Sequence, residues 1–174
     1  MSINNKTKNG SYDFKSQAAW AKPPPKRLSS YKIRCYIYQC RDLPAADSEG
    51  SSDPYIEVWA TDKVKPRTPV IQDNCNPIFF STLEIYYDFS TPADAPPIIL
   101  NIWDEDIGIL GNESSDFIGR AIIPLSEAAY STDDTIPTPR WHGVKMGFSE
   151  HDPSSGEILC SFSLVADDYR FKVP

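Results

Sequence analysis

Residues 31–38 read Tyr-Lys-Ile-Arg-Cys-Tyr-Ile-Tyr, in which apolar and polar side chains alternate. Because successive side chains of a β-strand point to opposite faces, this period of two predicts a strand with Ile33, Cys35 and Ile37 on one face. The last apolar run, residues 157–164, alternates in the same way. Its apolar face carries Ile158, Cys160, Phe162 and Leu164. We expect both segments to contribute to the core of a β-sheet domain.

Short strand-like runs with turn residues between them connect these two segments, a spacing that favours a β-sandwich over alternating βαβ units. Eight runs begin near Tyr31, Tyr55, Pro66, Ile78, Ile98, Phe117, Arg140 and Glu157. Proline outnumbers glycine, 16 to 8, which suits strands joined by stiff loops better than helices. We expect a single all-β domain, because 174 residues leave no room for a second full one.

The two ends of the chain differ from its middle. Residues 1–30 are polar and contain the run Pro23–Pro25, which imposes an extended backbone. We therefore predict a linker or arm over residues 1–30, a domain over 31–168 and a tail over 169–174. No run approaches the roughly 18 apolar residues of a membrane-spanning helix, and the first residues lack the apolar core of a secretory signal. A cytoplasmic setting is expected.

Several classes of function are disfavoured. The formal charge of −7 argues against a nucleic-acid partner. The four cysteines form no CxxC pair and no histidine lies near them at ligand spacing, which argues against zinc and for reduced thiols. An enzyme is not expected, because the sequence has no glycine-rich phosphate cradle, nucleophile elbow or recognisable triad. An Asp-x-Asp pair does also occur where metals hold nucleotide-sugar phosphates, so a metal-dependent transferase is the enzyme alternative.

Carboxylates gather where strands begin or end. Five aspartates lie in two loops of this kind: Asp47, Asp53, Asp104, Asp106 and Asp116. If the two loops meet at one end of a sandwich, their charges repel unless a cation neutralises them. Calcium fits best, because it takes six to eight oxygens in irregular geometry, whereas zinc prefers histidine or cysteine. The spacing is not that of an EF-hand, since a closing glutamate is missing.

These residues resemble the C2 domain family. Leu43-Pro44-Ala45-Ala46-Asp47 followed by Ser52-Asp53-Pro54-Tyr55 is similar to the first calcium loop of that family. Trp103-Asp104-Glu105-Asp106 with Asp116-Phe117-Ile118-Gly119 is similar to its third loop, and Asn76-Pro77-Ile78-Phe79 to its fourth-strand entry. The resemblance covers residues 31–165. Within the family, residues 34–44 and 155–159 look most like a ferlin module.

The resemblance implies an eight-stranded antiparallel Greek-key β-sandwich of type II topology, in which the first and last strands pair and Ile33 lies on a strand next to Phe162. It also carries over the five aspartates as calcium ligands, with the backbone carbonyls of Ala46 and Glu105. One departure is the long third loop, which makes Asp116 the least secure ligand. Asn112, Glu113 and Ser115 are either solvated loop residues or, as the alternative, the source of a supplementary oxygen ligand.

The family resemblance implies a calcium-dependent module that binds anionic phospholipid membranes. The tip of the third loop carries Ile107, Ile109 and Leu110, which we expect to insert into the bilayer, the alternative being that they cap the sandwich edge. Lys63, Lys65 and Arg67 form either a phosphoinositide patch or a solvated face. A calcium-independent domain that is structural or binds proteins, including other domains of the same chain, is the second hypothesis.

Ferlins are long, tail-anchored proteins with several C2 domains that act in vesicle fusion and membrane repair. The narrower resemblance therefore implies that this chain is a segment of such a protein, placed at the cytosolic face of a membrane.

Overall fold

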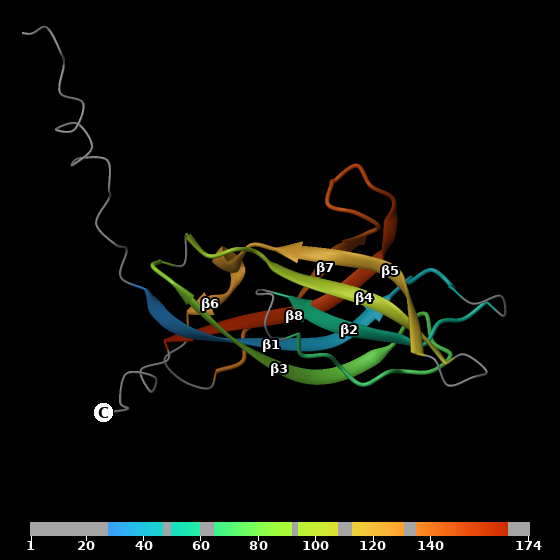
Figure 1. Cartoon of the computed structure of the whole chain (residues 1–174), viewed down its shortest axis with the longest axis horizontal. Helices are drawn as coiled ribbons and strands as arrows, with labels where there is room; N and C mark the ends of the chain where they lie inside the picture. Colours follow the sequence, from blue (N-terminus) through green and yellow to red (C-terminus); the bar gives the residue numbers. More distant parts are fainter. Residues whose placement is uncertain are drawn as a thin grey trace, which may run out of the picture.

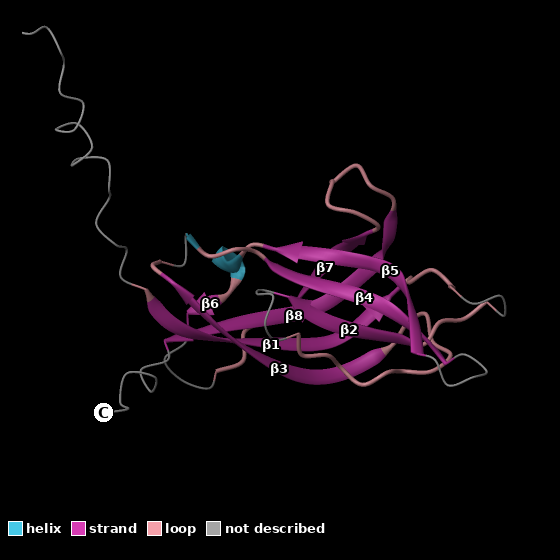
Figure 2. Cartoon of the chain, viewed as in Figure 1, coloured by secondary structure: helices cyan, strands magenta, loops and turns pink. Residues whose placement is uncertain are grey.

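The computed structural model describes residues 28–46, 50–59, 65–91, 94–107, 113–130 and 135–166, and in this part the chain is all-β. The strands run along the long axis of the domain (Figure 1). The described part also contains the 3-10 turn η4 (Leu125–Glu127) (Figure 2). The strands are β1 (Ser29–Arg41), β2 (Pro54–Trp59), β3 (Ile78–Phe89), β4 (Ile98–Ile107), β5 (Glu113–Ile123), β6 (Ala129–Tyr130), β7 (Arg140–Lys145) and β8 (Ser154–Ala166).

The strands form two layers around one core. Their hydrogen-bonded order is β2-β4-β5-β7-β8-β1-β3, and the short β6 adds to β8 in parallel. The link between β5 and β7 is narrow, with Arg120 and Lys145 as its one pair in register among the described residues. The sheet folds over at this link, so that Ile56 and Leu100 of one layer share a core with Ile33 and Cys160 of the other. The predicted β-sandwich is confirmed.

The first and last strands lie side by side, as type II topology requires. In the register of β1 with β8, Ile33 pairs with Leu164 and Cys35 pairs with Phe162. The alternation in the sequence is also reproduced, since Ile33, Cys35 and Ile37 are each at most 2% exposed. Because β1 and β8 are antiparallel, the loop that follows β1 lies at the same end of the sandwich as the start of β8.

The predicted strand near Pro66 is wrong. In the described residues this run forms one isolated bridge, between Glu57 and Arg67. Pro66 and Pro69 have no N–H group to donate to a ladder. The Thr68 hydroxyl instead accepts a hydrogen bond from the backbone N–H of Ile56 at 3.0 Å. The described part still has eight strands, because the unpredicted β6 takes the place of this run.

The described part contains no helix long and apolar enough to cross a membrane. All four cysteines lie in this part without disulfide bonds. Burial raises the pKa of the thiols of Cys35 and Cys40, and raises the pKa of Cys160 to about 12. These thiols therefore act as small apolar core groups. Residues 1–27 of the predicted arm and the predicted tail lie outside the described residues.

Candidate metal centre

The hairpin of β4 and β5 brings two predicted ligands opposite each other. Asp104 on β4 is the register partner of Asp116 on β5. Directly opposed residues of an antiparallel pair project from the same face, with Cβ atoms about 4.5 to 5.5 Å apart. Asp104 is 1% exposed, whereas Asp116 is open to solvent. Two like charges in this position destabilise the strand pair unless a cation neutralises them.

A β-bulge is responsible for this pairing. The register between β4 and β5 is regular up to Ile102 and then shifts by one residue on β5. In an unbroken register Asp104 would face Phe117, and Asp116 would pair with Glu105 on the other face of β4. The extra residue thus moves the Asp116 carboxylate onto the face that Asp104 occupies. Bulges of this kind commonly redirect side chains next to functional sites.

Asp106 joins the same face. It follows Asp104 by two residues on β4, and side chains two apart in a strand share a face. Its register partner is Ser114, and its side chain is half-buried. Of the residues predicted to offer a supplementary oxygen, Ser115 instead accepts a hydrogen bond from the Tyr55 hydroxyl at 3.2 Å.

The loop before β2 places Asp53 against this hairpin. The backbone N–H of Asp53 donates to Oδ1 of Asp104 at 2.5 Å, and the carbonyl of Asp53 accepts from the N–H of Glu105 at 3.1 Å. Oδ1 of Asp53 accepts from the N–H of Asp73 at 2.8 Å. The segments around Asp53, Asp73 and Asp104, far apart in the chain, are therefore joined by direct hydrogen bonds.

Ser52 organises the first loop, and the sequence analysis did not identify it. Ser52 is fully buried. Its hydroxyl accepts from the N–H of Ala46 at 2.9 Å and donates to the carbonyl of Pro44 at 3.1 Å. The Ser52 carbonyl accepts from the N–H of Asn74 at 2.8 Å. A serine immediately before the aspartate of a predicted calcium loop is a weak signal, because serine is common in any turn.

Asp73 connects the two loops on either side of β2, and the sequence analysis did not identify it. Its backbone has a φ of 52°, a left-handed conformation that non-glycine residues seldom adopt and that aspartate and asparagine adopt more often than most. Its Oδ1 accepts a hydrogen bond from the Ser51 hydroxyl at 3.2 Å. Together with its N–H bond to Asp53, this contact ties the loop after β2 to the loop before it.

The described residues include only some of the remaining predicted ligands. Asp47 and Asn112 lie outside the described residues, and the side chain of Glu113 is not described. The backbones of Ala46 and Glu105 are in place. The Glu105 side chain points away from the aspartates and forms an ion pair with Arg67, with 3.3 Å between Oε1 and Nη1. This leaves the Glu105 carbonyl, and not its carboxylate, as the predicted donor.

The candidate ligand atoms are carboxylate oxygens, which suit a cation that prefers oxygen ligands. Within the described ranges, no three histidine, cysteine, aspartate or glutamate side chains converge into a complete metal-binding group. The set present at this end of the sandwich is made of carboxylates alone: Asp53, Asp104, Asp106 and Asp116. Carboxylate oxygens suit calcium or magnesium and disfavour zinc. We call these four residues the candidate metal centre.

The predicted basic patch is only partly described. Nζ of Lys65 lies 3.8 Å from the centroid of the Trp59 ring, and the Arg67 guanidinium lies 5.0 Å from that of Tyr55. Both side chains are exposed but rest on aromatic faces along β2. Lys63, Ile109 and Leu110 lie outside the described residues, and the side chain of Ile107 is not described.

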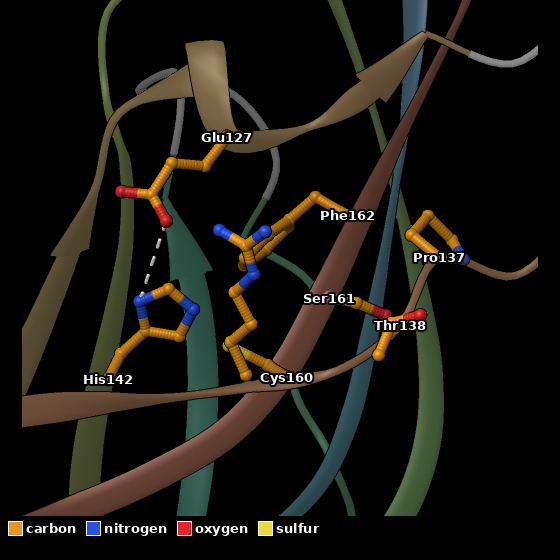
Figure 3. Close-up of a pocket in the computed structure, with 8 residues that line it drawn as sticks. Glu127, Pro137, Thr138, His142, Cys160, Ser161 and Phe162 are labelled. Atoms are coloured by element: carbon orange, nitrogen blue, oxygen red, sulfur yellow. Dashed lines mark ion pairs between the residues drawn. The ribbon is translucent and has the colours of Figure 1, made fainter.

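A separate pocket of about 320 Å³ lies between η4, β7 and β8 (Figure 3). Nδ1 of His142 lies 4.0 Å from a carboxylate oxygen of Glu127, and Ser161 and Thr138 border the other side. Burial lowers the pKa of His142, against the opposing effect of Glu127. The sequence analysis did not predict this pocket, because its residues come from three segments without a local motif.

Comparison with known proteins identifies the family of the chain. A family model described as "C2 domain" matches residues 31–144. Human myoferlin is 32% identical over 146 residues, which cover 80% of this chain and 7% of myoferlin. Mouse myoferlin is 34% identical over the same share of both chains. The chain thus spans a small part of the length of these relatives.

Solved C2 structures share the fold at low sequence identity. A calcium-bound pair of C2 domains from extended synaptotagmin 2 aligns with a TM-score of 0.56 and 19% identity, over 83% of this chain and 48% of theirs. A single C2 domain of plant extended synaptotagmin 1 aligns with a TM-score of 0.56 and 15% identity, over 81% of this chain and 98% of its own. With the family match over residues 31–144, the chain belongs to the C2 domain family.

Proposed function

We propose that this chain is a non-catalytic C2 module that binds anionic phospholipid membranes in a calcium-dependent manner. The pairing of Asp104 with Asp116 is the observation that carries the proposal. A buried carboxylate directly opposite a second one is a costly arrangement for a purely structural hairpin. A divalent cation bound between the two carboxylates would offset this cost, because it neutralises their charges.

Each aspartate has a distinct part in this proposal. Asp104 is fixed by the N–H of Asp53 and holds the inner side of the site. Asp106 and Asp116 offer more accessible carboxylates, and Asp53 offers a carboxylate from the first loop. Asp47 and the carbonyls of Ala46 and Glu105 complete the proposed ligands. Calcium, when bound, supplies positive charge and open coordination positions for lipid phosphate or carboxylate oxygens.

Charge explains why membrane binding should depend on calcium. The chain carries a formal charge of −7, and anionic lipid surfaces repel such a protein. Neutralising the aspartate end removes the repulsion where the loops approach the bilayer. We propose that Ile107, Ile109 and Leu110 then insert, and that Lys63, Lys65 and Arg67 contribute contacts with lipid headgroups.

The similarity to myoferlin supports a wider assignment. The aligned part covers 80% of this chain and 7% of human myoferlin. We propose a parent protein of the ferlin type, tail-anchored, with this domain at the cytosolic face of membranes that fuse or are repaired. Other domains of the same chain are further candidate partners. The proposed domain spans residues 31–168.

A calcium-independent domain is the second candidate, and one observation favours it. Asp104 already accepts a hydrogen bond from the backbone of Asp53 and is almost fully buried. Its carboxylate therefore has a structural use without any metal. In that case the domain would support protein contacts and its stability would not respond to calcium.

Sedimentation with vesicles separates the two functions. The protein is mixed with vesicles of phosphatidylcholine and phosphatidylserine, in calcium or in EGTA. Calcium-dependent sedimentation of the parent protein, lost in Asp104→Asn/Asp106→Asn, is the expected result. Equal sedimentation of the parent protein in calcium and EGTA would reject calcium dependence and favour the second candidate.

A further inference from the structure

The turn between β7 and β8, residues 146–153, exposes large apolar side chains beside cationic ones. Phe148 is 71% exposed and Met146 is 46% exposed. Ile122 on the neighbouring strand β5 is 39% exposed. A hollow of about 260 Å³ lies among these side chains, and Arg120, Lys145, Ile122 and Phe148 border it. We call these five residues the turn patch.

Phe148 is held in its exposed position by Arg120. The guanidinium carbon lies 4.0 Å from the centroid of the Phe148 ring and 4.6 Å from that of Phe117. The Arg120 side chain thus contacts two rings, the partly buried ring of Phe117 and the exposed ring of Phe148. An aromatic side chain that is ordered before binding loses less conformational entropy when a partner covers it.

The turn itself is ordered by its own hydrogen bonds. Asp152 accepts from the N–H of Ser149 at 2.8 Å and donates its own N–H to the carbonyl of Ser149 at 3.1 Å. The N–H of Met146 donates to the carbonyl of Pro153 at 3.1 Å. The exposure of Phe148 therefore belongs to a defined turn.

The charge of the patch favours an anionic partner. Neither Arg120 nor Lys145 forms an ion pair with a carboxylate of the described residues. The Nε atom of Arg120 is buried without a hydrogen-bond partner there. Glu150 is the one acidic residue that borders the hollow. The lining of the hollow thus holds two cations and one carboxylate, while Asp152 in the same turn accepts a hydrogen bond from the N–H of Ser149 with its carboxylate.

The turn patch lies at the same end of the sandwich as the candidate metal centre. The last residue of β1, Arg41, pairs with Glu157 near the start of β8. The loop that leads to Asp53 leaves β1 at this point, and the β7–β8 turn enters β8 there. On β5, Arg120 follows shortly after Asp116. In Figure 1 the turn projects from the sandwich beside β5.

We propose that the turn patch is a second contact for the anionic phospholipid surface, formed without a calcium ion of its own. The Phe148 ring, with Met146, enters the boundary between headgroups and acyl chains, and Arg120 and Lys145 face the anionic headgroups. This inference rests on the proposed membrane-binding function. The position at the same end of the sandwich as the metal centre, and two cations that form no ion pair among the described residues, favour a lipid surface over a protein partner.

Matched variants test the patch with vesicles of phosphatidylcholine and phosphatidylserine at saturating calcium. Phe148→Ala is compared with Ile136→Ala, which removes another side chain that is 58% exposed. Lys145→Gln is compared with Arg140→Gln at the other end of β7, because both remove one positive charge. We expect Phe148→Ala to weaken vesicle binding about tenfold and Lys145→Gln about fivefold. Both control variants should stay within about twofold of the parent protein.

A tryptophan variant measures directly whether the side chain at position 148 enters the bilayer. In Phe148→Trp, brominated acyl chains should quench the new fluorescence on vesicle binding, and should not do so in Ile136→Trp. Vesicle binding of Phe148→Ala that equals that of Ile136→Ala, or equal quenching in the two tryptophan variants, would overturn the patch. Failure of the proposed function has a different signature, namely equal binding of the parent protein in calcium and EGTA. A parent protein that binds no vesicles would overturn both.

Discussion

Replacing Asp116 by asparagine should stabilise the calcium-free domain. Asp116 lies opposite Asp104 in the β4–β5 register, so their Cβ atoms are about 5 Å apart, and we take this separation for the two charges. Their repulsion is about 0.8 kcal/mol at the dielectric constant of water and larger where burial lowers it. In a domain of this size, such a gain raises the melting temperature by about 2 to 3 °C. The effect should shrink as salt screens the pair.

Thermal unfolding in EGTA and in calcium measures this effect and its reversal. In calcium the parent protein gains ligand-binding free energy, about 2.7 kcal/mol at a hundredfold excess over the dissociation constant. Asp116→Asn should gain less and so become the less stable protein. Glu150→Gln removes one exposed charge outside the centre and should change neither midpoint. A lower midpoint of Asp116→Asn in EGTA, or a higher one in calcium, would refute the reasoning.

Three further predictions concern the framework of the domain. Gly119→Ala should lower the free energy of unfolding by about 1 to 3 kcal/mol, measured by urea unfolding, because the added Cβ would lie 2.7 Å from a Val144 methyl. Gly143→Ala, where nothing lies within 4 Å, should not destabilise the domain by such a clash. Ser52→Ala should cost about 1 to 3 kcal/mol, since the N–H of Ala46 and the carbonyl of Pro44 lose their partner. The lowered pKa of His142 means that the unfolded chain binds its proton more readily, so stability should fall as pH decreases from about 7.5 to about 5.5. His142→Gln should show a smaller fall in melting temperature over that range, and an equal fall would contradict the assignment.

The sequence predicted the architecture well because two strong signals agree. Alternation around Ile33 and Phe162 identifies strands that are buried on one face, and these two strands do pair with each other. Aspartates at strand ends then indicate which end of the sandwich carries a site. Both signals are local, so they can be read without knowing the partners of each strand.

The details of the centre depend on pairing between distant segments, which the sequence does not show. The bulge that moves Asp116 onto the face of Asp104 arises in the β4–β5 register. The structural roles of Ser52 and Asp73 appear only when the loops on either side of β2 meet. The predicted strand near Pro66 does not form because Pro66 and Pro69 have no N–H groups to donate to a ladder, and the described residues of the run make only an isolated bridge to β2.

Calorimetric titration with calcium tests the central claim most directly, since that claim is that aspartates of the first loop and of strands β4 and β5 hold the ion. The parent protein and Asp104→Asn/Asp106→Asn are titrated under the same conditions, after both are shown to be folded by their melting transitions. We predict a saturable binding heat for the parent protein and its loss in the double variant. Absence of calcium heat in the folded parent protein, or an unchanged isotherm in the double variant, would contradict the account.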